Sequence, residues 1–386
     1  MRDTPITRLR GLGQSVWLEG IGRSMLLSGE LAALVQEDGV SGLASTVASL
    51  ERLVAGGNDY DASIALLSRH GLGAAHICAA LLAEDARLAA ELLRPVYELS
   101  QGQEGFATLE VSPRLARDAG ATVAEARRLW DTADCPNLYI RIPGTLEGVA
   151  ALRQLVREGI SVCVTLVFSV PRYRAVADAY MDALAQRAAR GLPLECVASV
   201  VELPLMQIDR LLEPLLSTLA KGENAERSLV QALRGKGAIA LAKALHCVNR
   251  EIHGNDRYRV LAARGGRAQR LVWASSGAGD LTYPEALIGA GTVQLMAPGM
   301  LAVYREHGAP ACRLDEGMQE AIVLLEKLCA LGVNLHHLAQ ELEDEGVERL
   351  TRPYDSLLRS IELKRREAVG FSEWVPVTGP DVAQGD

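Results

Sequence analysis

The chain of 386 residues is poor in aromatic residues and lysine, and it has no arrangement of cysteines that would hold a metal. Only 4% of the residues are Phe, Trp or Tyr, so aliphatic side chains must build most of the core. The seven cysteines are scattered, without a Cys-x-x-Cys pair. An odd, dispersed set is typical of reduced thiols, and we predict a cytoplasmic location.

Several classes of partner are disfavoured. The net charge of -8 argues against nucleic acid and against an anionic membrane surface. No apolar stretch is long and uncharged enough to span a membrane, and the N-terminus, with Asp3 and several arginines, does not read as a secretory signal. The histidines show no metal spacing, and we predict no metal site.

Lysine is the scarcest of the charged residues. Any amine chemistry must therefore use one of five positions, which are Lys221, Lys236, Lys243, Lys327 and Lys364.

What the sequence does have is a regular alternation of short apolar segments with longer helical ones. Its hydrophobic share of 49% is ample for a large core. The predicted strands are Ser15–Glu19, Val40–Ser45, Phe106–Val111, Leu138–Ile142, Ile160–Phe168, Cys196–Val201, Arg270–Ser275 and Thr292–Leu295. Alternation of this kind predicts a parallel α/β fold. Because no Gly-rich phosphate loop follows the first strand, we favour a single (β/α)8 TIM-type barrel with extra helices over a doubly wound sheet.

The predicted barrel covers residues 14–367, after an N-terminal segment of residues 1–13 and before a loose C-terminal tail of residues 368–386. Two of its helices carry end signals. Thr122–Asp131 begins with a Thr-x-x-Glu capping box, and Thr145–Glu158 stops at Gly159.

The stretch Asn137–Thr145 contains an arginine in an otherwise apolar strand, and its role is the central question. Strand side chains alternate, so Leu138, Ile140 and Ile142 share one face while Tyr139 and Arg141 share the other. A charge inside a barrel is costly unless it is paired or functional. A structural ion pair between Arg141 and Glu110 would explain it.

A binding site would explain it equally well. The same alternation places a set of polar side chains inside the barrel, mostly late in their strands, where barrel enzymes keep their active sites. The set is Glu19, Thr46, Glu110, Arg141, Cys163, Thr165 and Ser199.

Several motifs resemble the transaldolase family, in its longer bacterial type. They occur in order from about residue 8 to 365 and are Leu12–Leu18, Gly29–Leu31, Asp38–Val40, Asp59–Asp61, Leu93–Tyr97, Leu109–Pro113, Asn137–Thr145, Val164–Ser169, Arg234–Lys236, Trp273–Ser275 and Glu345–Val347. The resemblance implies a (β/α)8 barrel. It also implies transfer of a dihydroxyacetone unit from sedoheptulose 7-phosphate to glyceraldehyde 3-phosphate through a lysine imine, without metal or cofactor.

The resemblance also shows where this chain departs from the family. The imine lysine of the Lys-Ile-Pro-Gly-Thr motif corresponds to Arg141, and arginine is a poor nucleophile because it stays protonated. The family aspartate of the first strand corresponds to Glu19, and an asparagine corresponds to Cys163. The Thr-Ser-Asn-Pro-Thr motif has become Ala44–Ala48, which contains Thr46.

Both phosphate-binding positions differ as well. One corresponds to Pro204 and the other falls in Ser276–Gly279, which carries no charge. Glu110, Thr165 and Ser199 are retained. We therefore expect a closed ion-pair network of Arg141 with Glu110 and Glu19, and no phosphate-sized basic pocket.

Four hypotheses follow. The chain is a transaldolase-like pseudoenzyme or repurposed sugar-related protein, or a working transaldolase whose amine is Lys236. In a third, Arg141 lowers the pKa of Cys163 and makes it reactive, against the simpler interpretation of a small core residue. In the fourth, the chain is an interaction protein that binds a protein partner or forms a homo-oligomer.

Overall fold

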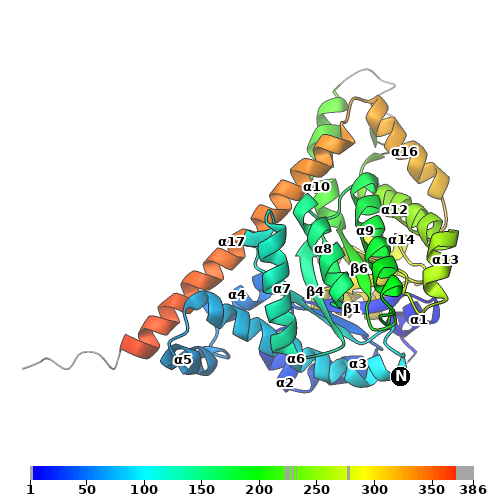
Figure 1. Cartoon of the computed structure of the whole chain (residues 1–386). Coiled ribbons are helices and arrows are strands. Elements are labelled where there is room, and N and C mark those ends of the chain that lie inside the picture. The colour runs from blue at the N-terminus through cyan, green and yellow to red at the C-terminus, as the bar shows by residue number, and fades with distance from the viewer. Residues whose placement is uncertain (1–2, 222–226, 228–229, 232, 276–278, 371–386) are drawn as a thin grey trace, which may run out of the picture.

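The structure, a computed structural model, describes residues 3–221, 227, 230–231, 233–275 and 279–370. Eight parallel strands form one closed barrel in sequence order (Figure 1). They are β1 (Ser15–Glu19), β2 (Gly42–Ala44), β3 (Phe106–Glu110), β4 (Leu138–Pro143), β5 (Val162–Thr165), β6 (Ser199–Pro204), β7 (Arg270–Ser275) and β8 (Val293–Met296). The predicted (β/α)8 barrel is confirmed.

Helices surround the barrel and extend beyond it. Before β3 the chain forms α1 (Pro5–Gly11), α2 (Arg23–Leu27), α3 (Glu30–Glu37), α4 (Val47–Gly56), α5 (Asp61–Arg69) and α6 (Ala74–Leu99). Between β3 and β7 lie η1 (Pro113–Leu115), α7 (Ala119–Ala133), α8 (Leu146–Glu158), α9 (Val170–Ala189), α10 (Leu205–Leu219), α12 (Gly237–Gly254) and α13 (Asp256–Ala262). The last are α14 (Thr282–Ala286), α15 (Pro298–His307), α16 (Met318–Ala330) and α17 (Leu335–Gly370).

Strand bounds differ most from prediction at β5 and β6. β1 and β7 have the predicted bounds, whereas β5 ends at Thr165 because Leu166 takes a φ of 60°. That left-handed conformation cannot continue a strand. β6 starts at Ser199 and runs to Pro204, which brings Glu202 into the strand.

The capping box predicted at Thr122 is wrong. α7 begins at Ala119, and the Asp118 side chain accepts the hydrogen bond from the Ala121 backbone N–H. Asp118 lies upstream and already caps the free N–H groups, so Thr122 is an interior helix residue. Its hydroxyl donates to the Leu115 carbonyl instead.

The start and stop of α8 agree with the sequence. Thr145 is its N-cap and accepts a hydrogen bond from the Gly148 N–H, and the helix stops before Gly159, whose φ is 101°. The Thr145 hydroxyl also donates to the Ala116 carbonyl at 2.6 Å. This bond ties the end of the β4 stretch to the segment that follows β3.

The barrel interior has three levels. An aromatic level in the middle stacks Phe106 on Tyr139, with ring centroids 4.3 Å apart, and Trp17 lies 5.9 Å from Tyr139. At the N-terminal ends of the strands, Arg270 pairs with Glu104 at 2.9 Å. The third level, at the C-terminal ends, contains Arg141.

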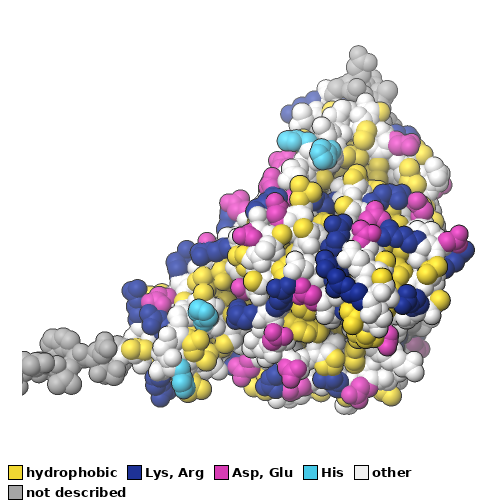
Figure 2. Space-filling model, viewed as in Figure 1, with side chains coloured by type: hydrophobic (Ala, Val, Ile, Leu, Met, Phe, Trp, Pro, Cys, Tyr) yellow, Lys and Arg dark blue, Asp and Glu magenta, His cyan; other side chains and the backbone are white. Residues whose placement is uncertain are grey.

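The outside of the molecule carries both signs of charge. On the face shown in Figure 2, acidic and basic side chains are interspersed. Among the described helices, none meets the length and hydropathy of a membrane span alone. α16 and α17, bent by 95° at their junction, meet it only as a pair.

Candidate functional site

The third level of the barrel is organised around Arg141 on β4. Tyr139 belongs to the interior group of side chains, whereas Ile140 and Ile142 belong to the layer beneath the helices. Alternation therefore places Arg141 inside the barrel, as predicted. Its side chain is 6% exposed.

Three side chains surround the Arg141 guanidinium. Its Nε and Nη2 donate to the two carboxylate oxygens of Glu202 at 3.0 and 2.7 Å, and its Nη1 donates to Glu110 at 3.1 Å. Nη2 also lies 3.4 Å from the Thr165 hydroxyl, which donates to Glu202 at 3.2 Å. We call Arg141, Glu110, Glu202 and Thr165 the ion-pair cluster.

The ion-pair cluster is buried and carries more negative than positive groups. Arg141 and Glu110 are each 5% exposed and Glu202 is 4% exposed. Burial raises the pKa of Glu110, and the attraction of Arg141 only partly offsets this. Burial alone would lower the pKa of Arg141, but Glu202 and Glu110 outweigh it and raise that pKa above its ordinary value. Arg141 is thus held as a cation, and the pKa of Glu110 lies above its ordinary value because burial outweighs the attraction of Arg141.

Cys163 lies beside Arg141 in the β4–β5 register and is 2% exposed. Burial, followed by the negative charge of Glu202, raises the pKa of its thiol despite the nearby cation. The hypothesis of a lowered pKa at Cys163 is therefore wrong, because burial and Glu202 outweigh the lowering effect of Arg141. Cys163 is a small core residue next to the cluster.

Glu19, at the end of β1, and Thr46, just after β2, do not contact Arg141 in the way that we predicted. The Thr46 side chain caps α4 by accepting a hydrogen bond from the Ser49 N–H at 3.3 Å, and the next backbone N–H, of Val47, donates to Glu110. Glu19 ends β1 and is partly buried. The sequence predicted it as the second carboxylate partner of Arg141, but Glu202 holds that place.

The prediction that Ser199 points into the barrel is wrong. Val200 belongs to the interior group while Val201 and Leu203 lie under the helices, so Ser199 faces outward and Glu202 faces inward. The Gln269 side chain donates to the Ser199 hydroxyl at 2.8 Å. The signal that was missed is a glutamate flanked by apolar residues at the strand end.

All five lysines are among the described residues, and none lies inside the barrel. Lys221, Lys236 and Lys327 are exposed, and Lys364 pairs with Asp61. Lys243, on α12, donates to the Arg313 and Glu316 carbonyls. The described residues also contain no group of three or more His, Cys, Asp or Glu side chains arranged to hold a metal.

A hollow of mixed charge lies between α10 and α17, and none of its lining residues belongs to a barrel strand, so it does not test the expectation that the barrel mouth lacks a basic pocket. Its volume is about 380 Å³, and it is lined by Arg210, Arg349, Arg352, Glu345 and Glu348. Arg352 pairs with Glu348 at 2.6 Å and Arg349 lies 3.8 Å from Glu345, so two of the three cations are offset. The hollow is nonetheless large enough for a phosphate group.

Comparison with known proteins agrees with this geometry. The model of the transaldolase/fructose-6-phosphate aldolase family matches residues 16–361. The chain belongs to this family. A transaldolase of Thiobacillus denitrificans is 40% identical over 355 residues, covering 91% of this chain and 97% of the relative.

Two further relatives match this chain over a similar share of their length. A transaldolase of Thermobifida fusca is 37% identical, covering 92% of this chain and 96% of its own length. A protein named transaldolase 2 from a Nostoc species is 35% identical, covering 93% and 97%. The family resemblance inferred from the motifs is thus confirmed over nearly the whole chain.

Proposed function

We propose that this transaldolase-family barrel does not transfer dihydroxyacetone units through an imine at Arg141. It is a pseudoenzyme or a repurposed protein whose ligand is a sugar phosphate or a related small molecule. The observation that carries the proposal is the environment of Arg141. Its guanidinium is bound by two buried carboxylates, and no lysine lies inside the barrel to replace it.

The chemical argument concerns the nucleophile. Imine formation requires a neutral amine with a free lone pair. A guanidinium stays protonated in proteins, and Glu202 and Glu110 raise the pKa of Arg141 further. Glu110 and Thr165 could still move protons or bind hydroxyl groups, but the covalent step of the family reaction has no nucleophile here.

The second candidate is an active transaldolase acting on sedoheptulose 7-phosphate and glyceraldehyde 3-phosphate. The names of the relatives favour it more directly than they favour the first proposal. The hollow at Arg210 also supports it, because a phosphate could bind there. Its amine would have to come from Lys236, which is exposed at the start of α12 and would have to enter the barrel.

A turnover assay separates the two candidates. The purified chain and an Arg141→Lys variant are assayed with fructose 6-phosphate and erythrose 4-phosphate, beside the Thiobacillus denitrificans relative as a positive control. We expect background rates for both, since the family's phosphate positions differ as well. Rates of the wild-type chain close to the control would establish the second candidate.

Calorimetry with fructose 6-phosphate then distinguishes the remaining possibilities. Binding without turnover supports a repurposed or regulatory sugar-phosphate site. No binding, together with a stoichiometric protein partner after purification, supports an interaction protein instead.

A further inference from the structure

Helix α17 crosses the face of the barrel at which the ion-pair cluster lies. It contacts elements that follow three different strands, β2, β3 and β6, and Figure 1 shows it running diagonally past α10, α7 and α4 toward α5. Ser356 donates to Glu51 on α4 at 2.8 Å, and Asp355 pairs with Arg114 of η1 at 2.7 Å. The segments after parallel strands meet at the C-terminal face, so α17 covers that face.

The N-terminal half of α17 is fastened by one buried carboxylate. Glu343 is 3% exposed and pairs with Arg117 at 2.8 Å and with Arg172 at 3.0 Å. Arg117 follows β3, and Arg172 lies in the first turn of α9, which follows β5. We call Arg117, Glu343 and Arg172 the clasp, because it joins α17 to two separate edges of the barrel mouth.

The same part of α17 also contacts the backbone next to the ion-pair cluster. A side chain at Gly346 would meet the end of the Leu166 side chain at 2.8 Å, so the two residues are in close contact. Leu166 directly follows Thr165 of the cluster and has the unfavourable φ of 60°. A left-handed leucine persists only where its surroundings hold it, and α17 provides part of that support.

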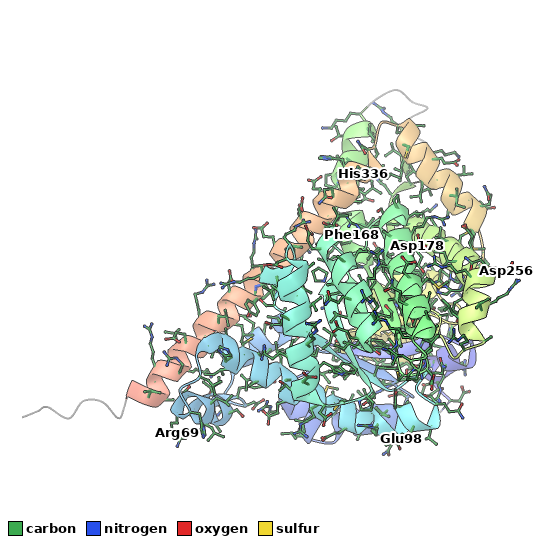
Figure 3. All side chains as sticks on the ribbon, viewed as in Figure 1. Arg69, Glu98, Phe168, Asp178, Asp256 and His336 are labelled. Carbon is green, nitrogen blue, oxygen red and sulfur yellow. The ribbon has the colours of Figure 1, made fainter. Side chains whose placement is uncertain are left out.

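The packing beside the clasp is incomplete. A hollow of about 210 Å³ lies there, lined in part by Leu146, Phe168, Arg172 and His336. Figure 3 shows Phe168 beneath the end of α17 that carries His336. The Nη1 atom of Arg172 is buried without a hydrogen-bond partner. The turn before α17 contains Gly332 with a φ of 85°, so a flexible residue lies at its start.

We propose that the segment of α17 from Leu335 to Gly346 is a strap that opens the barrel mouth when the clasp breaks. In the closed state the members of the ion-pair cluster are nearly inaccessible, so a ligand reaches Arg141 only after the strap lifts. When Gly346 leaves, Leu166 loses its support and the backbone at Thr165 can move. The strap controls access whatever chemistry takes place at Arg141.

Cys163 is a natural probe of this opening, because it is buried beside Arg141. The test is the rate at which iodoacetamide labels Cys163 in the full chain, followed by peptide mass spectrometry in wild type and in Glu343→Gln. Glu343→Gln removes the charge that holds Arg117 and Arg172 to α17 and so weakens the closed strap, and we expect labelling about tenfold faster or more in the variant. Cys135, buried at the opposite end of β4, reports global unfolding and should keep its rate.

Asp344→Asn is the matched control. Asp344 pairs with the same Arg117 but is 59% exposed, so its neutralisation should leave the labelling of Cys163 unchanged. Gly346→Leu tests the strap without altering charge, because its side chain would push Leu166 away, and it should also speed the labelling of Cys163 alone. The proposal is overturned if Cys163 is no more reactive in either variant, or if Cys163 and Cys135 always accelerate together.

Discussion

The two ends of the barrel interior each hold an arginine paired with glutamate, but the two sites differ in charge balance and exposure. At the N-terminal end, Arg270 pairs with one carboxylate, Glu104, and their side chains are 17% and 22% exposed. Ser15 and Ser41 each bond to Glu104 as well. At the C-terminal end, Arg141 faces two carboxylates, and all three side chains are at most 6% exposed.

The difference indicates a structural ion pair at the Arg270 end and a candidate functional site at the Arg141 end. An ion pair with no net charge that remains partly hydrated, such as Arg270–Glu104, has a small desolvation cost. It fills the N-terminal end of the barrel. A fully buried cluster with an excess carboxylate costs more than apolar residues of the same size would. Perturbed groups of this kind concentrate at functional sites, so the Arg141 end is the candidate site for the function proposed above.

The largest expected effect comes from removing each arginine. Arg141→Met leaves two carboxylates buried without a cation, and we expect the free energy of unfolding to fall by about 3–5 kcal/mol. Arg270→Met leaves Glu104 close enough to water to be hydrated again, and we expect a loss of about 1–2 kcal/mol. Urea unfolding at neutral pH measures both. Equal losses would remove the distinction between the two ends.

Replacing one glutamate at each end by glutamine should change the free energy of unfolding by less, and in opposite directions at the two ends. The folded state raises the pKa of Glu110 above its ordinary value of 4.5, so it binds the proton more tightly than the unfolded chain does. The contribution of Glu110 to the free energy of unfolding is therefore fully present below its ordinary pKa. It is lost as the pH rises through the raised pKa of the folded state. Glu110→Gln should abolish that loss.

The measurement is the free energy of unfolding from acid to mildly alkaline pH. Above the raised pKa we expect Glu110→Gln to have a higher free energy of unfolding than wild type, because the variant does not keep a charged carboxylate buried at this position. Glu104→Gln should instead lose about 1 kcal/mol, because Arg270 loses its charged partner. A Glu110→Gln curve parallel to wild type at every pH would contradict the account.

The smallest expected effect is at Ser199. Its hydroxyl faces away from the barrel interior and accepts from Gln269, so Ser199→Ala should cost about 1 kcal/mol or less. We expect no change in the affinity for any ligand of the Arg141 end, measured by calorimetry. Thr165→Val, which removes a hydroxyl inside the cluster, is the comparison variant. Weaker ligand binding by Ser199→Ala would show that Ser199 contributes to the binding site after all.

The sequence was enough to predict the barrel and three of the four members of the ion-pair cluster, all except Glu202. Apolar runs with strong turn signals define β1 and β7, and a lone charge among Leu138, Ile140 and Ile142 identifies Arg141 as an interior residue. Glu110 followed from the same alternation on β3. These features are local, so they can be read from single strands.

Features that depend on partners distant in sequence were missed. β6 carries apolar residues on both faces, as buried parallel strands do, so the apolar pattern does not show which face is inward, and the lone glutamate at the strand end was the one local signal. The Arg117–Glu343 bond joins residues 226 positions apart, and no periodicity indicates where α17 crosses the barrel. The raised pKa of Cys163 likewise follows from burial and from Glu202, neither of which the sequence shows.

The most direct test of the central claim is borohydride reduction in the presence of fructose 6-phosphate. An imine with a lysine would be reduced to a stable secondary amine, which intact-mass and peptide mass spectrometry would detect. We predict no adduct on any of the five lysines, with the Thiobacillus denitrificans relative as the positive control. A stoichiometric adduct on any lysine of this chain would contradict the account.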